Sequence, residues 1–288
     1  MNTKRLKMNN NTKKDLEQID RAWNKLEPLL EEQSIPKLFH FISSSKLYAI
    51  AAMLLLITIS SIVFHSIYFK EVVYITKFGE TKKLVLPDQS IVYLNGNSKL
   101  SFNKHWLNFQ DREVKVEGEA FFSVKHTENN QKFFVRMTNH SSVEVLGTEF
   151  NIQNRDYDTK VTLNSGKIKF HIADNQDENK KTILMKPGEL VEYESSSNSL
   201  TKKIVEPENH SSWRNSKLLF EKTELKEIIN LIKNTYGLNI KVNDPELFKM
   251  KVSGSAPSHN IDILVKGLSE IFELNLIVKG DSLFVSPK

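Results

Sequence analysis

The hydrophobic and polar residues of this chain change pattern three times along its length. The most apolar stretch, LYAIAAMLLLITISSIVFHSIYF at residues 47–69, contains no Asp, Glu, Lys or Arg and lies between Lys46 and Lys70. A helix of this length is about 34 Å long, enough to cross the roughly 30 Å hydrocarbon core of a bilayer. A buried helix of a soluble protein rarely runs this far without a charge, and a cleavable signal peptide has a shorter leading region. We therefore predict a single-pass transmembrane helix over residues 47–69.

The region before this span has apolar residues three or four positions apart, which is the spacing of one helix face. These residues are Leu16, Ile19, Trp23, Leu26 and Leu30. Thr12 and Asp15 resemble a capping box at which the helix is expected to begin, and Pro28 is expected to kink or break it near Glu27. The apolar face either rests on the membrane surface or folds against a partner protein, with Trp23 as the anchor.

From Val72 to about Glu206 the hydrophobic period shortens to two, which is typical of strands. In EVKVEGEAFFSVK, apolar and charged residues alternate, so one face is expected to pack while Glu117 and Glu119 face water. About ten short strands at this spacing predict an all-β domain, either a sandwich or a solenoid-like stack. Turn sequences that predict hairpins occur at Pro87-Asp88, Asn95-Gly96, Asn164-Ser165-Gly166 and Lys186-Pro187-Gly188-Glu189.

Beyond Pro207, strand and helix patterns alternate. The segment LLFEK predicts a strand, after which Thr223 is expected to cap a helix that ends at Gly237. A second helix is expected from Ile261 to Phe272, followed by a hairpin in LNLIVKGDSLFVS. This βαβ-βαββ order predicts a small α+β module of roughly 70 residues, near the lower size limit of a domain.

Composition excludes several classes of function. The 288 residues include no cysteine, which rules out disulfides, cysteine-ligated zinc and thiol catalysis. The net charge of +5 is mild, and lysine and glutamate are mixed along the chain, so direct nucleic-acid binding is not indicated. The sequence has no HExxH motif, no glycine-rich phosphate loop and no GxSxG elbow. We therefore expect no catalytic residue, no metal site and no cofactor.

The charges around the span bear on its orientation. Two lysines precede the span and four follow it within about 20 residues, which by the positive-inside rule opposes a cytoplasmic N-terminus. That rule concerns short loops, however, and long domains cross a membrane largely regardless of charge. The short, lysine-rich region before the span therefore favours an inner-membrane protein with a cytoplasmic N-terminus and a periplasmic C-terminus.

Six segments follow one another in the β region, namely LPDQSIVYLNGNSKLSF, REVKVEGEAFFSVK, FFVRM, VEVLGTEFNI, VTLNSGKIKF and MKPGELVEY. In this order they resemble the periplasmic domain of FecR-type anti-sigma factors. The module that begins WRNSKLLFEKTELKEIINLIKNTYGLNIKV resembles the C-terminal domain of the same family, which is related to the secretin and TonB short N-terminal domain. DRAWNKL resembles the end of the family's cytoplasmic sigma-binding region. The family usually has Gly where this sequence has Gln89.

The resemblance implies four regions. They are a cytoplasmic helical sigma-binding region (1–46), the transmembrane helix (47–69), a FecR-like all-β periplasmic domain (72–206) and a C-terminal α+β signalling-contact domain (213–288). Sigma binding is expected at Leu16, Ile19, Trp23 and Leu26. Contact with a transporter is expected at Leu219, Phe220, Leu225 and Tyr236. The structural motif of the family corresponds to Pro87, Asp88, Asn95, Gly118, Glu119, Phe121, Phe122, Gly147, Thr148, Phe150, Gly166, Pro187 and Gly188.

The resemblance also implies a signal relay. The signalling domain of an outer-membrane TonB-dependent transporter contacts the C-terminal module, and envelope proteases then free the cytoplasmic segment with its extracytoplasmic-function sigma factor. A second hypothesis is a membrane-anchored envelope scaffold or docking protein that binds no sigma factor, which the shortness of residues 1–46 favours. A third, an anchored enzyme, would need a pocket in which Glu117, Glu119 and Glu149 converge. The first two differ in whether residues 1–46 bind a sigma factor.

Overall fold

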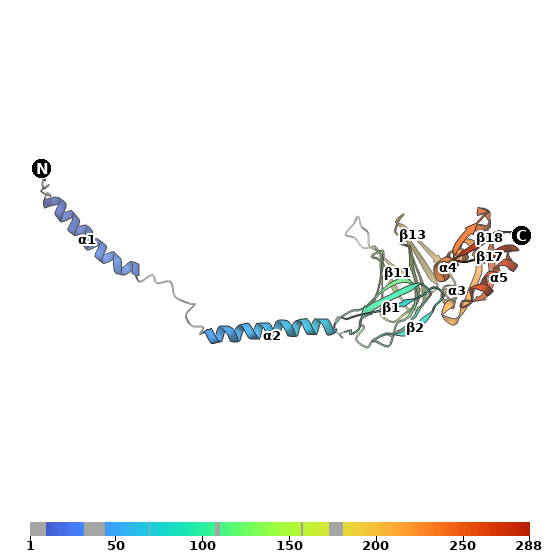
Figure 1. Ribbon diagram of the computed structural model, residues 1–288, viewed down its shortest axis with the longest axis horizontal. Helices are drawn as coiled ribbons and strands as arrows, with labels where there is room; N and C mark the ends of the chain where they lie inside the picture. Colours follow the sequence, from blue (N-terminus) through green and yellow to red (C-terminus); the bar gives the residue numbers. More distant parts are fainter. Residues whose placement is uncertain (1–9, 32–43, 69, 107–109, 157, 173–180) are drawn as a thin grey trace. The chain divides into compact units, whose positions relative to one another are not determined.

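The computed structural model describes residues 10–31, 44–68, 70–106, 110–156, 158–172 and 181–288 (Figure 1). The chain divides into two compact units, Met1–Phe64 and His65–Lys288. The first unit holds helical segments, and the second combines a mainly β part with a small α+β part. The predicted fold class is confirmed.

Two helices precede the β part, α1 (Asn10–Glu31) and α2 (Ser44–Tyr68). The predicted cap of α1 is wrong, because the helix begins at Asn10 and Thr12 lies inside its first turn. Of the kink or break predicted near Glu27, the break does not occur, since the helix continues through Pro28 to Glu31. A proline can bend a helix without ending it, so its presence alone does not locate a helix end.

The β part contains thirteen strands in one sheet. They are β1 (Glu71–Thr76), β2 (Lys82–Val85), β3 (Ile91–Leu94), β4 (Ser98–Asn103), β5 (Arg112–Ser123), β6 (Phe133–Met137), β7 (Ser142–Val145), β8 (Glu149–Arg155), β9 (Asp158–Ser165), β10 (Ile168–Ile172), β11 (Lys181–Met185), β12 (Glu189–Glu194) and β13 (Ser199–Ile204). The main path runs β11-β10-β7-β6-β5-β8-β9-β12-β13, with β1 to β4 branching from β5.

Strand β5 joins the two halves of this sheet. Strands β4 and β6 pair with its first half, and β3 and β8 pair with its second half. The sheet is thereby bent into a half-barrel. Buried residues from both halves form one hydrophobic core, which includes Leu94, Leu100, Val116, Phe122, Phe133, Phe150, Leu163 and Phe170. The all-β prediction is confirmed, and the arrangement is a half-barrel where the sequence left a sandwich or a solenoid-like stack open.

Only one of the four predicted hairpins has paired strands. Strands β2 and β3 pair across the Pro87-Asp88 turn. The other three turns connect β3 to β4, β9 to β10 and β11 to β12, and in each case the two strands pair with different neighbours, in opposite halves of the sheet. These turns are corners between the halves. Turn residues reverse the chain direction, but they do not choose the strand with which the next segment pairs.

The C-terminal part follows the predicted βαβ-βαββ order after a short connecting helix. Its elements are α3 (Pro207–Ser211), the 3-10 helix η2 (Ser212–Asn215), β14 (Lys217–Glu224), α4 (Leu225–Tyr236), β15 (Asn239–Val242), η3 (Pro245–Lys249), β16 (Lys251–Pro257), α5 (Ile261–Ile271), β17 (Leu274–Lys279) and β18 (Ser282–Pro287). Strand β14 pairs with β16, while β15, β18 and β17 form a three-stranded sheet.

The start of α4 differs from the prediction. Thr223 belongs to β14, and its hydroxyl accepts a hydrogen bond from the amide of Glu221 (3.1 Å) instead of capping the helix. The amide of Leu225, the first residue of α4, donates to the carbonyl of Met250 (2.7 Å), so the main chain next to β16 satisfies this helix end. The predicted C-terminal end is confirmed, because Gly237 ends α4 with φ +77°.

Candidate functional site

The apolar face of α1 is open to solvent in the residues that the structure describes. Ile19, Trp23 and Leu26 are 61%, 59% and 48% exposed. Leu16 lies in the same helix, but its side chain is outside the described part of the chain. A helix with an uncovered apolar stripe and a large aromatic residue at its centre is a common form of partner-binding segment.

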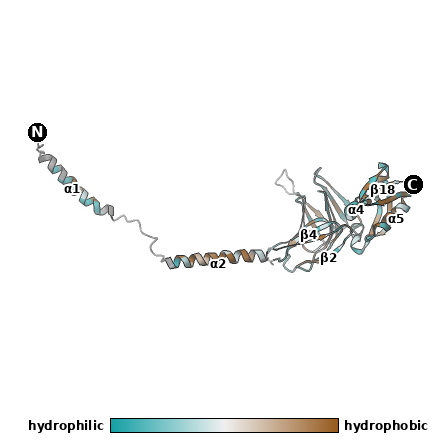
Figure 2. Cartoon of the chain, in the orientation of Figure 1, coloured by the Kyte–Doolittle hydropathy of each residue, from teal (hydrophilic) through white to brown (hydrophobic). Residues whose placement is uncertain are grey.

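Helix α2 has the length and composition of a membrane span. Its residues Ser45–Phe64 have a mean hydropathy of 2.4, and none of this window is buried against protein. Figure 2 shows hydrophobic colouring along most of the helix. An apolar helix that no protein covers meets the requirements for crossing a bilayer.

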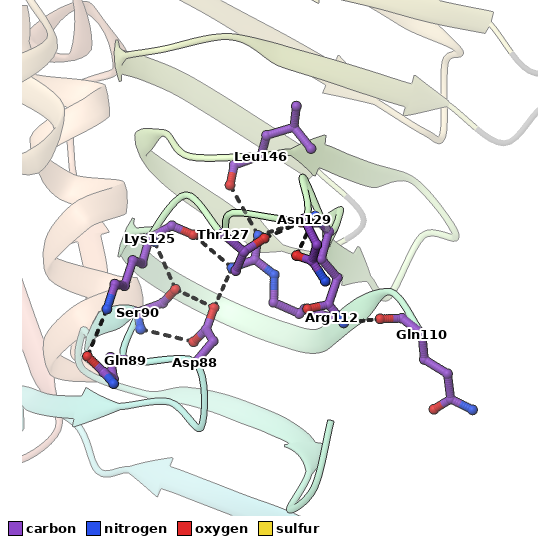
Figure 3. A network of polar contacts seen from close by, with 10 residues as sticks. Asp88, Gln89, Ser90, Gln110, Arg112, Lys125, Thr127, Asn129 and Leu146 are labelled. Carbon is purple, nitrogen blue, oxygen red and sulfur yellow. Dashed lines mark hydrogen bonds and ion pairs between the residues drawn. The ribbon is translucent and has the colours of Figure 1, made fainter. Parts of the chain in front are cut away.

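The most buried charge in the β part is the guanidinium group of Arg112, at the start of β5 (Figure 3). It forms an ion pair with Asp88 (2.5 Å), whose side chain is 7% exposed. It also donates to the main-chain carbonyls of Lys125, Gln131 and Leu146, at 2.8, 2.7 and 3.1 Å. These four acceptors come from three loops, because Lys125 and Gln131 both lie between β5 and β6, so one side chain ties together three loops at one end of the half-barrel.

A second buried charge, Glu119, lies on the outer face of β5. The prediction that Glu119 faces water is wrong, because its side chain is buried and accepts hydrogen bonds from Asn95 (2.8 Å) and Asn151 (2.9 Å). Its neighbour Phe121 belongs to the core of the C-terminal part, and the guanidinium of Arg214 lies 4.0 Å from the centre of the Phe121 ring. The connecting segment after α3 thus covers this face of β5.

Burial raises the pKa of the Glu119 carboxyl above its usual range. Hydrogen bonds from Asn151 and Asn95, the charge of Arg155 and the indole of Trp213 oppose this rise without cancelling it. Glu119 therefore holds a proton to a higher pH in the folded chain than in the unfolded chain.

Replacing Glu119 with Gln is expected to change how stability depends on pH. Because the folded-state pKa is raised, the stabilisation from this group is present below the ordinary carboxyl pKa and is lost as the pH rises through the raised value. The free energy of unfolding of the Gln variant should therefore fall less between these two pH values than that of the wild type. Denaturant unfolding across a pH series measures the difference.

Glu192 provides the opposite case as a control. Although partial burial acts to raise its pKa, hydrogen bonds from Lys203 and Lys160 lower it to about 2. Its contribution is present above the ordinary carboxyl pKa and is lost as the pH falls toward about 2, so Glu192→Gln should alter only the acid limb. Parallel pH curves for the wild type and Glu119→Gln would contradict the account of Glu119.

The C-terminal part also contacts the opposite end of the half-barrel from the Arg112 loops. The amide of Gly79 donates to the carbonyl of Thr235 at the end of α4 (2.8 Å). The Phe78 ring packs so closely on Gly237 that a Cβ there would lie 2.8 Å from it. Together with the Trp213 segment, these contacts join the C-terminal part and the β part into a single connected body.

The four candidate transporter-contact residues lie in the C-terminal part with unequal exposure. Leu225 is 1% exposed and packs in the core, so its side chain is not available to a partner. The hydroxyl of Tyr236 donates to the carbonyl of Ser258 (2.5 Å), and the ring is partly buried. Leu219 and Phe220 on β14 are half-buried. Among the described residues, no cluster of three or more His, Asp or Glu side chains could hold a metal ion.

Comparison with known proteins identifies both parts of the second unit. A model of the family described as "FecR protein" matches residues 72–169, and a model described as "FecR, C-terminal" matches residues 217–285. The chain belongs to the FecR family. Members of this family are regulatory proteins and not enzymes, and the membership supports an anti-sigma factor role.

Two crystal structures share the fold of this FecR protein. Both are of a candidate anti-sigma factor from Parabacteroides distasonis, at 2.50 and 1.65 Å resolution, with a TM-score of 0.64 and 21% sequence identity. The alignments cover 76% and 75% of this chain and 100% and 99% of the other. No curated protein matches the sequence.

The residues that the resemblance assigns to the family motif lie mainly in two groups in space. One group surrounds the Arg112 loops and includes Asp88 and the contact of Gly166 with Gly147 and Thr148. The other surrounds Glu119 and includes Asn95, Gly118 and Phe121. Phe122 and Phe150 stack in the core, 5.1 Å apart, and Pro187 and Gly188 form the corner between β11 and β12. Gln89 takes φ +69° in the turn after Asp88.

Sequence reasoning missed Arg112 and Trp213, although one of them left a signal. Arg112 lies two and four positions before Val114 and Val116, which face the core, so its side chain is on the same face of the strand. The alternation of the sequence therefore already indicated a charge that points into the core. A charge at such a position requires a partner, and Asp88 is that partner in this FecR protein. Burial of Trp213 depends on docking of the C-terminal part, which no local pattern encodes.

Proposed function

We propose that the chain is a single-pass anti-sigma factor. In this proposal α1 binds an extracytoplasmic-function sigma factor in the cytoplasm, α2 crosses the inner membrane, and residues from β1 onward lie in the periplasm. The uncovered stripe of Ile19, Trp23 and Leu26 on α1 carries the proposal, because an amphipathic helix with a central exposed aromatic residue is suited to bind a groove on a partner protein. Family membership supports the same role.

The first experiment tests capture of a sigma factor by the whole chain. The detergent-solubilised chain is immobilised and offered purified extracytoplasmic-function sigma factors, beginning with any encoded next to its gene. Capture by the full chain, and its loss from a variant that lacks residues 1–31, is the expected result. Failure of every sigma factor to bind would favour the scaffold hypothesis.

The C-terminal part is the proposed contact for the signalling domain of an outer-membrane TonB-dependent transporter. Strand β17 is an edge of its three-stranded sheet, and an extended segment of a partner can pair with such an edge. Ile277 and Val278 on β17 are 50% and 38% exposed. Leu276 and Val278 line a shallow groove of about 470 Å³ against α5, rimmed by Asp262, Lys266 and Glu270. Leu219 and Phe220 on β14, in the separate two-stranded sheet, remain candidates as well.

Replacing Val278, which lines the groove, with Lys is expected to weaken binding of the transporter's signalling domain by at least about ten-fold, because it puts a charge into the apolar contact. Ile263 on α5 is 52% exposed and does not line the groove, so Ile263→Lys is the matched control. Titration of the purified signalling domain against the chain measures both. Equal affinities of the two variants for the signalling domain would show that β17 is not part of the contact. The contact that triggers proteolytic release of the cytoplasmic segment would then lie elsewhere on the chain.

A further inference from the structure

A short connection determines which end of the β part lies next to the end of α2. Helix α2 ends at Tyr68 and β1 begins at Glu71, so the chain between them spans at most about 11 Å. If α2 crosses the membrane, as the proposed function holds, the start of β1 lies close to the bilayer surface whatever the tilt of the helix.

Strand register shows which loops share that end. Glu71 lies opposite Asn103, and β4 in turn pairs with β5 so that its last residues face the beginning of β5. Arg112 at the start of β5 is opposite Phe133, and Phe133 is opposite Val145, so β6 begins and β7 ends at this end. Ile168 is opposite Met185, so β10 begins and β11 ends here as well. The bonds of Arg112 bring in the loops of Asp88 and Lys125 (Figure 3).

This end of the half-barrel carries exposed positive charge without carboxylate partners. Five lysines lie in or beside these loops, each with an exposed residue surface and no ion pair among the described residues: Lys70, Lys104, Lys125, Lys167 and Lys186. The exposed carboxylates at this end are Glu71, Asp111 and Glu128. On the sheet faces, by contrast, many lysines have carboxylate partners, as in the pairs Lys160–Glu192 and Lys202–Glu189.

An apolar side chain lies among these lysines. Leu146 follows β7, is 39% exposed, and offers its carbonyl to Arg112 while its side chain points away from Arg112 (Figure 3). Lysines around an exposed leucine form the combination that binds an anionic lipid surface, with charge attracting the headgroups and the apolar group entering the interface.

We propose that these five lysines and Leu146 form a membrane-binding rim that holds the β part against anionic lipid headgroups. This proposal depends on the proposed function in one respect, which is that α2 must be the membrane span. The rim fixes which end of the half-barrel faces the bilayer, and it leaves the C-terminal part, which contacts the other end, free to meet a partner.

A single introduced cysteine tests this proposal, because the chain has none of its own. Leu146→Cys in the full chain is labelled with a fluorophore and placed in lipid nanodiscs of phosphatidylcholine, with or without phosphatidylglycerol. In anionic discs, quenching by neutral acrylamide should be at least about three-fold weaker than in neutral discs at low salt, and the difference should vanish at high salt. A label at Ser196→Cys, in the turn at the far end, should show no difference.

Charge-reversal variants distinguish binding through the rim from a general electrostatic attraction of the chain to anionic lipid. Lys104→Glu, Lys125→Glu and Lys167→Glu together should abolish the protection of residue 146, whereas Lys217→Glu, Lys226→Glu and Lys266→Glu in the C-terminal part should preserve it. Equal quenching in both kinds of disc, with the chain stably incorporated, would overturn the rim and leave the proposed function intact. Loss of the chain from the discs in alkaline carbonate would overturn the membrane span, and the rim with it.

Discussion

Replacing Arg112 with Ala is expected to destabilise the β part by about 3 to 5 kcal/mol, the cost of breaking a buried ion pair by removing one partner. The change leaves the Asp88 carboxylate 7% exposed without its cation, and it removes the donor to three main-chain carbonyls in the β5–β6 and β7–β8 loops. Arg112→Lys should recover little, because one ammonium group cannot reach four acceptors in the planar arrangement of a guanidinium.

Unfolding of the detergent-solubilised chain, followed by the β-sheet circular dichroism signal in denaturant, measures this loss. Arg136 is the matched control, since its ion pair with Glu113 is also on the first half of the sheet but the two side chains are 44% and 43% exposed. Arg136→Ala should cost no more than about 1 kcal/mol. Similar losses for Arg112→Ala and Arg136→Ala would show that the three-loop connection contributes little.

The second large effect is expected at Gly118, where β5 passes from one half of the sheet to the other. Its φ is +95°, and a Cβ there would lie 2.3 Å from the hydroxyl oxygen of Ser98 and 2.7 Å from the Ser98 Cα. The clash is with the backbone of β4, which cannot rotate away as a long side chain can. Gly118→Ala should therefore destabilise the chain by about 3 kcal/mol, from backbone strain and overpacking together.

Gly267 gives a control with the opposite sign. It lies in α5, and no atom comes within 4 Å of the position that an added methyl group would take, so Gly267→Ala meets no obstacle. Alanine favours a helix over glycine by roughly 0.5–1 kcal/mol, and the variant should be that much more stable than the wild type. The same unfolding experiment compares both variants. A Gly118→Ala chain as stable as the wild type would mean that the bend in β5 does not need glycine.

Much of the fold follows from local patterns in the sequence. The uninterrupted apolar run predicted α2, the period of two predicted the strands, and the βαβ-βαββ order of the C-terminal part needed only its helix stripes and turn residues. These features could be predicted because each depends on neighbours within a few positions. The position of Gly237 at the end of α4 is an example, since a C-cap glycine is recognised from the helix that precedes it.

Features that depend on distant contacts could not be predicted in this way. The turn at Asn95-Gly96 was visible, but pairing of β3 and β4 with successive halves of β5 requires the bend at Gly118. Glu119 has the parity of a solvent-facing residue and is buried because Trp213, almost a hundred residues later, packs over that face. The same distinction holds for the candidate sites. The exposed stripe of α1 could be predicted from helix periodicity, whereas the burial of Leu225 depends on docking of α4 onto its sheets.

The central claim is that α1 binds a sigma factor through its apolar face, and the affinity of the full chain in nanodiscs for its captured sigma factor tests it most directly. Trp23→Ala should weaken that affinity by at least about 30-fold, the effect of losing an aromatic hot spot. Lys25→Ala, on the opposite face of the same helix, should leave it within about three-fold of the wild type. Equal affinities for wild type and Trp23→Ala would contradict the account.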